Sequence, residues 1–186
     1  MSTQALFIQG AGQGAFAADA KLVASLRHLL GPEYEVHYPA MPHEDDADYE
    51  TWKVQIVSEL TALNDPVLLL GHSVGASILL KCMTEIAVEQ TIAGIFLIAT
   101  PFWGGDGWRY EGFARLALQE GFATKLPMRA PIFLYHSRDD EVVPFAHLGL
   151  YAQRMPQATI RELDGRRHQL NNDMSEVAED IKGLQL

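Results

Sequence analysis

Short strand-like segments alternate along this chain with longer amphipathic segments, and this alternation restricts the fold more than any other feature. The strand-like segments, most of them apolar, lie at residues 5–8, 35–38, 66–70, 92–99, 131–135 and 158–163. Helical patterns lie at residues 16–30, 49–63, 75–88, 145–154 and 175–184. Strands that alternate with helices form parallel sheets whose two faces are covered by the helices. We therefore expect an α/β fold, with a mostly parallel six-stranded sheet in a three-layer α/β/α sandwich.

The length and charge of the chain are typical of one acidic globular domain. At 186 residues a single domain is the ordinary outcome. We expect it to span residues 1–186, with a short aromatic-rich, lid-like segment at about residues 100–127. Asp and Glu number 24 against 14 Lys and Arg, so the formal net charge is −10. Because no basic tract is available to meet phosphates, we expect neither nucleic acid nor an anionic membrane surface as a partner.

Three further features indicate where the protein works. The only cysteine, Cys82, cannot form an internal disulfide, so nothing requires an oxidising compartment, and we expect it to be a small buried hydrophobic residue. Residues 1–10 lack the charged region and cleavage site of a secretory signal. The longest apolar stretches are shorter than the roughly 20 residues that cross a membrane. We expect a cytoplasmic protein.

Residues 71–75 read G-H-S-V-G and match the pattern G-x-S-x-G. They directly follow the apolar segment 66–70 and lead directly into a helical pattern. A serine on a sharp turn between a strand and a helix has its hydroxyl raised above the edge of the sheet, with the helix dipole directed at it. The pattern alone is common by chance, but its position between a strand and a helix is not. We expect Ser73 to be a nucleophile.

A serine hydroxyl becomes an effective nucleophile only when a base removes its proton, and seven histidines are available. In this architecture the partners follow in the chain order serine, acid, histidine. His168 is the only histidine downstream of the last predicted strand, so we expect it to be the base. The other histidines precede Ser73, precede the last strand, or stand in the turn itself and point away from the serine: His28, His37, His43, His136, His147 and His72.

The acid that orients the histidine is expected on the loop after the fifth strand. Asp140 begins the sequence D-x-V-V-P there, in which both valines are expected to pack down and Pro144 to begin the next helix. Asp139, directly before it, is the alternative. Asp106 is a weaker candidate because it lies in the irregular segment. We expect Asp140 to be the acid.

Two backbone N–H groups are expected to bind the negative charge that develops on the substrate oxygen. One is the N–H of Val74, directly after the nucleophile, and the other is that of Ala11, in the glycine-rich loop after the first strand. The same loop also matches a dinucleotide-binding fingerprint, G-x-G-x-x-A, at residues 10–15. That fingerprint requires an acidic residue at the end of the second strand, whereas Glu33 and Glu35 lie at its beginning. Since the sequence has no other cofactor motif and no metal-ligand cluster, we expect no cofactor and no metal.

With these residues in place, nearly the whole chain resembles the α/β-hydrolase superfamily. The matching features are the G-x-S-x-G pattern, Asp140 in D-x-V-V-P, His168 after the last strand and the glycine-rich loop after the first. More narrowly, the chain is similar to the small, cap-poor serine hydrolases of the retinoblastoma-binding-protein type, in the sequence Y-P-A-M-P at residues 38–42 followed by Trp52. Gln9 departs from the superfamily, which usually has a histidine there. Because backbone groups bind the oxyanion, we expect altered local geometry rather than lost activity.

The resemblance implies a sheet of order 2-1-3-4-5-6, and hydrolysis of an ester, thioester or amide through an acyl-enzyme. It also implies that the segment after the fourth strand lies over the serine. In that segment Phe102, Trp103 and Trp108 indicate an apolar substrate pocket, with the alternative that such aromatic residues only pack the segment onto the sheet.

The leading hypothesis is a serine hydrolase that cleaves a small-molecule carboxylic ester, or a thioester, as a monomer or homodimer. Thioesterase or amidase activity would use the same three side chains. The alternative from another class is a hydrolase fold used as a non-catalytic binding protein, because a fold alone does not determine function. Arg166 and Arg167, beside His168, either contact an anionic substrate group or are solvated loop side chains, and the second interpretation is favoured.

Overall fold

The strand-like segments of the sequence form a parallel sheet in the computed structural model, which describes residues 2–104 and 111–185. Within these residues the sheet has six strands in the spatial order β2-β1-β3-β4-β5-β6, and every neighbouring pair runs parallel. The strands are β1 (Thr3–Ile8), β2 (Tyr34–His37), β3 (Val67–His72), β4 (Ile92–Ile98), β5 (Ile132–Ser137) and β6 (Thr159–Leu163). The predicted α/β fold and the strand order implied by the resemblance are confirmed.

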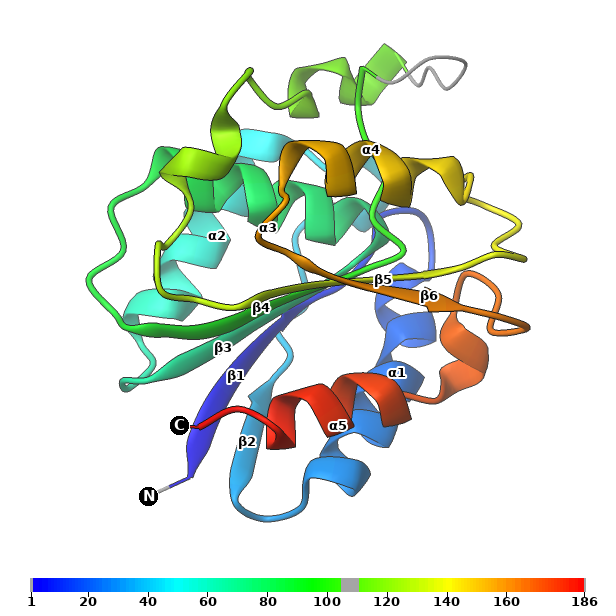
Figure 1. Cartoon of the computed structure of the whole chain (residues 1–186). Coiled ribbons are helices and arrows are strands. Elements are labelled where there is room, and N and C mark those ends of the chain that lie inside the picture. The colour runs from blue at the N-terminus through cyan, green and yellow to red at the C-terminus, as the bar shows by residue number, and fades with distance from the viewer. Residues whose placement is uncertain (1, 105–110, 186) are drawn as a thin grey trace.

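Helices cover both faces of this sheet. The α-helices are α1 (Ala15–Leu30), α2 (Tyr49–Thr61), α3 (Ser73–Glu85), α4 (Ala146–Arg154) and α5 (Ser175–Lys182). Short 3-10 helices are η1 (Glu44–Asp46), η2 (Glu111–Leu116), η3 (Phe122–Lys125) and η4 (Leu170–Asn172). In Figure 1, α1 and α5 lie against one face of the sheet, and α2, α3 and α4 lie against the other. The three predicted layers are therefore present.

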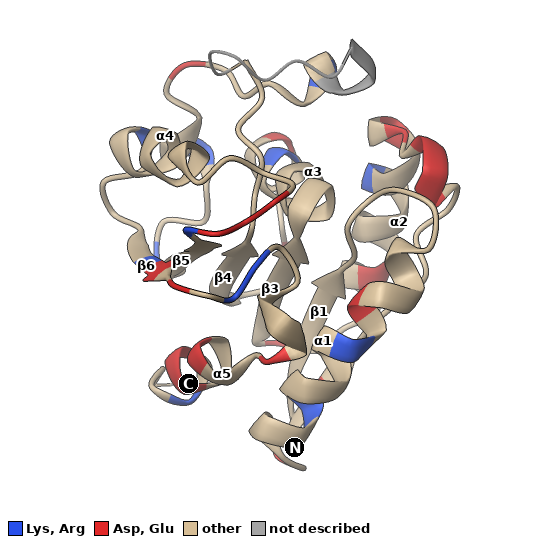
Figure 2. Cartoon of the chain, turned by 90° about the vertical axis from the view of Figure 1, so that its right-hand side faces the viewer, with Lys and Arg blue, Asp and Glu red and all other residues tan. Residues whose placement is uncertain are grey.

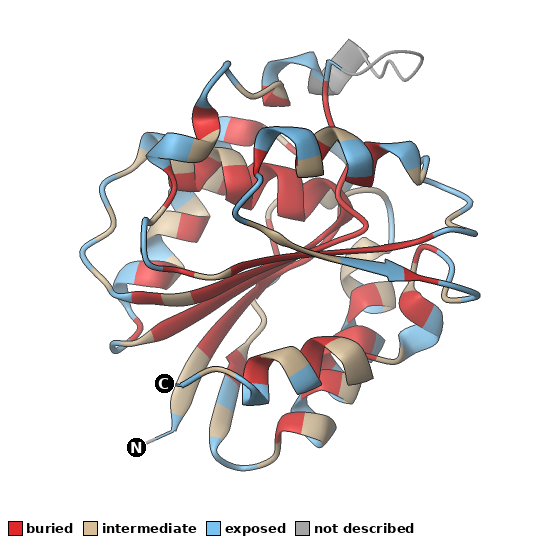
Figure 3. Ribbon diagram, in the orientation of Figure 1, coloured by how far each residue is buried: buried red, intermediate tan, exposed pale blue. Residues whose placement is uncertain are grey.

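Alternate side chains of each strand point to opposite faces and build two hydrophobic cores. In β3, Leu69 packs with the core under α2, α3 and α4, whereas Leu68 and Leu70 pack with the core under α1 and α5. All three side chains are fully buried, and Figure 3 shows buried residues along the central strands. A parallel strand covered on both faces is apolar throughout, which explains the unbroken apolar run at residues 66–70.

The junction between β3 and α3 is tighter than the sequence indicated. The predicted strand ends at residue 70 and the predicted helix begins at residue 75, but β3 continues through His72 and α3 begins at Ser73. No loop residue separates them. The serine therefore lies at the carboxyl end of a central strand, which is the edge where open α/β sheets bind their ligands.

The acidic residues before α2 act on two different helices. Asp48 caps α2, because its side chain accepts a hydrogen bond from the N–H of Thr51 at 2.9 Å. Glu44 belongs to η1, whose three acidic residues are red in Figure 2. Its carboxylate instead accepts hydrogen bonds from the N–H groups of Gly14 and Phe16, at the first turn of α1.

Part of the predicted lid-like segment lies outside the described residues. Residues 105–110 are not described, so the expectations for Asp106 and Trp108 stay open. On either side of them the segment contains Trp103 and the helices η2 and η3. Within residues 2–104 and 111–185, none of the helices combines the length and the apolar character that crossing a membrane requires.

Candidate active site

The turn that carries Ser73 is held in a conformation that few residues adopt. Ser73 has a φ of 51°, in the left-handed region, although it is not a glycine. The neighbouring glycines allow close packing around it. A Cβ on Gly71 would lie 2.6 Å from the Cα of Ala76, and one on Gly75 would lie 1.8 Å from the carbonyl oxygen of Gln9. A strained residue between two crowded glycines is the arrangement expected for a nucleophile on a strand-to-helix turn.

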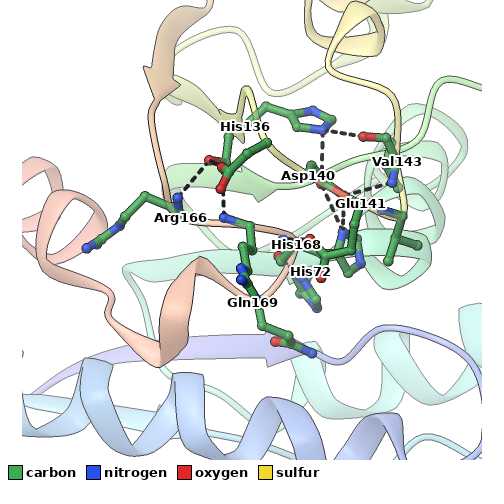
Figure 4. Close-up of polar contacts among 12 residues, drawn as sticks. His72, His136, Asp140, Glu141, Val143, Arg166, His168 and Gln169 are labelled. Atoms are coloured by element: carbon green, nitrogen blue, oxygen red, sulfur yellow. Dashed lines mark hydrogen bonds and ion pairs between the residues drawn. The ribbon is translucent and has the colours of Figure 1, made fainter.

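His168 and Asp140 lie in contact although 28 residues separate them in the sequence. The Nδ1 atom of His168 lies 2.9 Å from Oδ2 of Asp140 and 3.1 Å from Oδ1. His168 comes from the loop after β6 and Asp140 from the loop after β5, and Figure 4 shows the two side chains meeting. Because the carboxylate is an acceptor, Nδ1 carries the hydrogen and Nε2 is left as the acceptor. This is the tautomer that a general base requires.

Asp140 is held by more than one partner. Its Oδ1 atom accepts hydrogen bonds from the backbone N–H groups of Val142 and Val143, each at 2.8 Å. The Nε2 atom of His136 lies 3.1 Å from its Oδ2 atom, on the far side of the carboxylate from His168 in Figure 4. Burial opposes ionisation, but hydrogen bonds from His136 and His168 outweigh it and lower the pKa of Asp140 well below its usual range. These contacts favour the ionised carboxylate and hold its orientation.

The alternative acid, Asp139, does not contact His168. Its carboxylate accepts hydrogen bonds from the Ser137 hydroxyl at 2.5 Å and from the N–H of Arg167 at 3.1 Å. Asp139 therefore links the loop after β6 to the end of β5 through hydrogen bonds. The sequence favoured Asp140 over Asp139, and among the described residues only the Asp140 carboxylate has a hydrogen bond with the His168 ring.

The environment of His168 favours its neutral form. Its side chain is largely buried, and the residue is only 8% exposed. Burial lowers the pKa of His168 below the ordinary value of 6.5, against the opposing effect of the hydrogen bond to Asp140. The His72 ring, whose centroid lies 4.8 Å from that of His168, adds to the lowering. A neutral imidazole is the state that can accept a proton from a serine.

The loop after β1 brings Ala11 to the same place. The N–H of Gly10 donates to the carboxylate of Asp19 at 2.7 Å, and the N–H of Gly12 donates to the carbonyl of Glu44 at 2.6 Å. Between them, the N–H of Ala11 has no hydrogen-bond acceptor among the residues that the structure describes. The N–H of Val74 belongs to the first turn of α3, where the helix supplies no acceptor. Among the described residues neither N–H group has a hydrogen-bond acceptor, which the predicted role of both as oxyanion donors requires.

Glu44 contradicts the dinucleotide alternative for this loop. Dinucleotide folds place a phosphate at the N-terminus of the first helix, where backbone N–H groups receive it. Here the Glu44 carboxylate accepts from the N–H groups of Gly14 and Phe16 at 2.8 and 2.7 Å, and from the side-chain amide of Gln9 at 2.9 Å. A protein carboxylate therefore holds the position of the phosphate, and the loop is fixed from within the chain.

Gln9 supports the same loop, together with residues of the sequence Y-P-A-M-P and Trp52. The Gln9 side chain, fully buried, accepts from the N–H of Met41 at 3.0 Å and donates to Glu44. The indole of Trp52 donates to the carbonyl of Pro42 at 2.7 Å. The departure at Gln9 therefore links the loop after β1 to residues 41–44 through both ends of the amide.

A pocket of about 370 Å³ joins these groups. Ser73, Val74, Ala11 and His168 all line it. Its other lining residues are mainly small or apolar: Gly10, Gly12, Gln13, Gly14, Ala15, Ala18, Asp19, His72, Trp103, Val142, Val143 and Gln169. Among the described residues, no hydrogen bond joins Ser73 to His168 in this structure. Such contacts are often long before a substrate binds.

The predicted substrate residues separate into different places. Trp103 lines the pocket. Phe102 does not; its ring packs edge-on against Tyr151 of α4, with centroids 5.0 Å apart, and the residue is 6% exposed. The position of Phe102 therefore agrees with the alternative that aromatic residues of this segment serve packing and do not form the substrate pocket. We also expected Val142 and Val143 both to pack down. Val143 is buried, as expected, but Val142 is 51% exposed and lines the pocket.

Most of the chain also matches one protein family. The model of a family described as serine hydrolase matches residues 28–174, a range that includes Ser73, Asp140 and His168. This chain belongs to the serine hydrolase family. No curated protein sequence matches this serine hydrolase.

Solved structures share the fold of this serine hydrolase over nearly its whole length. The ydeN gene product of B. subtilis has 18% identity and a TM-score of 0.72, with 98% of each chain covered. The esterase domain of a Rhodothermus marinus protein has 19% identity and a TM-score of 0.68, over 97% of this chain and 85% of that one. Est1E from Butyrivibrio proteoclasticus has 16% identity and a TM-score of 0.71, over 98% and 86%. At these identities the likeness shows the α/β-hydrolase fold, and the narrower resemblance to the retinoblastoma-binding-protein type stays a prediction.

The loop arginines of this serine hydrolase differ in their contacts. Arg166 is partly buried and forms ion pairs with Asp173 at 2.9 Å and Glu176 at 2.5 Å, so it is not the freely solvated loop side chain that the favoured interpretation expected. Arg167 is exposed. Cys82 is buried, as predicted. Within the described ranges, no group of three or more His, Cys, Asp or Glu side chains is arranged to hold a metal ion.

Sequence reasoning missed two residues that the structure brings to the site. Asp19 is fully buried and occupies the apolar stripe of α1, in step with Leu22 and Leu26. A lone carboxylate in such a stripe is a usable sequence signal, because a buried acid needs a partner. His136 was set aside for its position in the chain. Its spacing of four residues from Asp140, across a tight turn after a strand, gives no comparable signal.

Proposed function

We propose that this serine hydrolase cleaves small carboxylic esters through an acyl-enzyme formed on Ser73. The observation that carries the proposal is the contact of His168 with the fully buried side chain of Asp140, beside a pocket that Ser73 also lines. An imidazole fixed in this way has one nitrogen left to accept a proton, and this supports a role in proton transfer with the serine that lines the same pocket.

The reaction follows from these positions. The Nε2 atom of His168 takes the proton of the Ser73 hydroxyl while the serine oxygen attacks the ester carbonyl. The N–H groups of Ala11 and Val74 bind the resulting oxyanion. His168 then returns the proton to the departing alcohol, which leaves the acyl group on Ser73. Water, activated by the same histidine, attacks the acyl-enzyme and releases the carboxylic acid and the free serine.

The pocket favours a small and uncharged substrate. Glycine and alanine residues of the loop after β1 and of the start of α1 line it, together with Trp103 and Val142. Asp19, which also lines it, already binds Gly10 and His72. The volume of about 370 Å³ is near the lower end of the range for small-molecule sites. The names of two structural neighbours include an esterase domain and Est1E, which also favours ester substrates.

Turnover of a p-nitrophenyl ester series, from acetyl to dodecanoyl, tests this proposal. We expect the wild-type protein to prefer the short esters and Ser73→Ala to lose turnover by at least about 1,000-fold. Ser58→Ala is the matched control, because Ser58 is exposed on α2. Circular dichroism establishes that each variant is folded. Turnover by Ser73→Ala at the wild-type rate would contradict the proposal.

The same assay separates the remaining alternatives. Serine-dependent cleavage of acyl thioesters with no cleavage of oxygen esters would identify a thioesterase instead. Absence of turnover on esters, thioesters and amides alike would favour a non-catalytic binding protein. A preference for dodecanoyl esters would contradict the assignment of a small acyl group.

A further inference from the structure

His72 is the buried neighbour of Ser73 that the proposed reaction does not use. Its ring is 2% exposed, and both ring nitrogens face oxygen atoms. Nδ1 lies 3.0 Å from Oδ2 of Asp19, and Nε2 lies 3.1 Å from the carbonyl oxygen of His168. The ring therefore bridges the first helix and the loop that carries the general base.

Two acceptors on one imidazole restrict its charge. A neutral imidazole has a single N–H group, so one of the two contacts would set a nitrogen lone pair against an oxygen lone pair. Only the imidazolium donates in both directions. Burial opposes this charged form, but the charge of Asp19 and its hydrogen bond raise the pKa of His72 above its usual value. Burial likewise opposes ionisation of Asp19, and His72 lowers the pKa of that carboxyl.

The partners of Asp19 connect the pair to the other parts of the site. Besides His72, its carboxylate accepts hydrogen bonds from the N–H of Gly10 at 2.7 Å and from the side-chain amide of Gln169 at 2.9 Å. Gly10 precedes the predicted oxyanion donor Ala11, and Gln169 follows the base. One buried ion pair thus contacts the turn of the nucleophile, the oxyanion loop and the loop of the base.

We propose that His72, held as an imidazolium by Asp19, is a positioning residue for His168: it fixes the backbone of the base and keeps its ring neutral. This inference rests on the proposed function where it treats His168 as the base. The charge of His72 does not depend on that function. The His72 and His168 ring centroids lie 4.8 Å apart, and a positive charge at that distance disfavours a second one.

Other charged groups also face the two rings. Asp140 contacts the His168 ring from the loop after β5, and Glu141 accepts a hydrogen bond from the His168 backbone N–H at 3.2 Å. The charges of Asp140 and Asp19 favour a protonated His168. The imidazolium of His72 opposes both, so its loss is expected to raise the pKa of His168.

Imidazole nitrogen shifts, measured by long-range ¹H–¹⁵N NMR on the wild-type protein, test the charge without any activity. At about pH 7, above the ordinary histidine pKa of about 6.5, we expect both nitrogens of His72 to be protonated and His168 to be neutral. In Asp19→Asn, which removes the counter-charge, His72 should carry one hydrogen only. A neutral His72 in the wild-type protein would overturn the proposal, whatever the protein hydrolyses.

A second NMR measurement tests the effect on the base. In His72→Gln, titration of His168 should show its pKa raised by roughly one unit, and the acid limb of kcat/KM should move to higher pH by the same amount. His28→Gln is the matched control, because His28 is exposed on α1, and it should change neither. An unshifted His168 in folded His72→Gln would contradict the proposal. If the protein has no turnover, the proposed function fails. The two NMR measurements still determine the charge of His72 and its effect on the pKa of His168.

Discussion

A Cβ atom on Gly75 would lie 1.8 Å from the carbonyl oxygen of Gln9. The first turn of α3 and the loop after β1 are therefore in backbone contact, with no room for a side chain between them. This contact sets the distance between the two predicted oxyanion donors, because Val74 precedes Gly75 and Ala11 lies two residues after Gln9. Packing at one glycine thus determines part of the geometry of the site.

Gly75→Ala should disrupt both stability and activity. The added methyl group must displace backbone, which we expect to cost about 3 kcal/mol of unfolding free energy and to move Ala11 away from Ser73. Urea unfolding and ester turnover measure the two effects. Gly149→Ala is the control, since a Cβ there meets nothing within 4 Å, and in α4 it should be neutral or stabilise by up to about 1 kcal/mol. Equal behaviour of the two variants would contradict the close contact.

Glu44→Gln should loosen the oxyanion loop. The Glu44 carboxylate accepts hydrogen bonds from Gly14, Phe16 and Gln9, and these partners lower its pKa, the largest effect being that of the Phe16 N–H. An amide keeps one acceptor and loses the charge beside the N-terminus of α1. We expect a lower stability of the folded protein and a fall in kcat. Asp45→Asn, at an exposed neighbour, should leave both unchanged, and similar losses in the two variants would argue against this role.

Replacement of the two adjacent aspartates separates the two candidate acids. Asp140→Asn keeps the shape of the side chain but allows the wrong tautomer of His168, so kcat should fall by about 10,000-fold. Asp139→Asn removes a charge that contacts Ser137 and Arg167, and we expect less than a tenfold loss. Steady-state kinetics on one short ester compares them. The reverse order of effects would assign the acid to Asp139.

The rate should depend on pH through His168. Because its pKa is lowered in the folded protein, the neutral base persists at pH values where an ordinary histidine is already protonated. The ratio kcat/KM should fall on acidification with a midpoint below about pH 6.5. A midpoint at or above that value, measured on a short p-nitrophenyl ester, would show that burial and His72 do not act on the base as the contacts indicate.

The sequence predicted the features of the fold that depend on local pattern. Apolar runs marked the strands, as at Leu68–Leu70 in β3, because a strand covered on both faces has no polar positions. Element ends were less certain, since the helix that begins at Ser73 has no conventional cap. The order of nucleophile, acid and base along the chain favoured His168 among the seven histidines, a prediction that its contact with Asp140 supports.

Contacts between distant segments could not be predicted in the same way. Glu44 lies next to α2 in the sequence, and its binding to the start of α1 depends on how η1 packs against the loop after β1. The pairing of Asp19 with His72 spans 53 residues. Phe102 and Trp103 are adjacent and both aromatic, yet one packs on Tyr151 and the other lines the pocket. Such differences depend on the direction of each side chain, which the residue types of a segment do not specify.

Covalent labelling tests whether the Ser73 hydroxyl is the nucleophile. Wild-type protein and Ser73→Ala are each treated with a fluorophosphonate, and the mass of the intact protein and of its peptides is measured. We expect one phosphonyl adduct per wild-type chain, located on Ser73, and none on Ser73→Ala. A folded wild-type protein that gains no adduct, or a Ser73→Ala protein that gains the same adduct, would contradict this expectation.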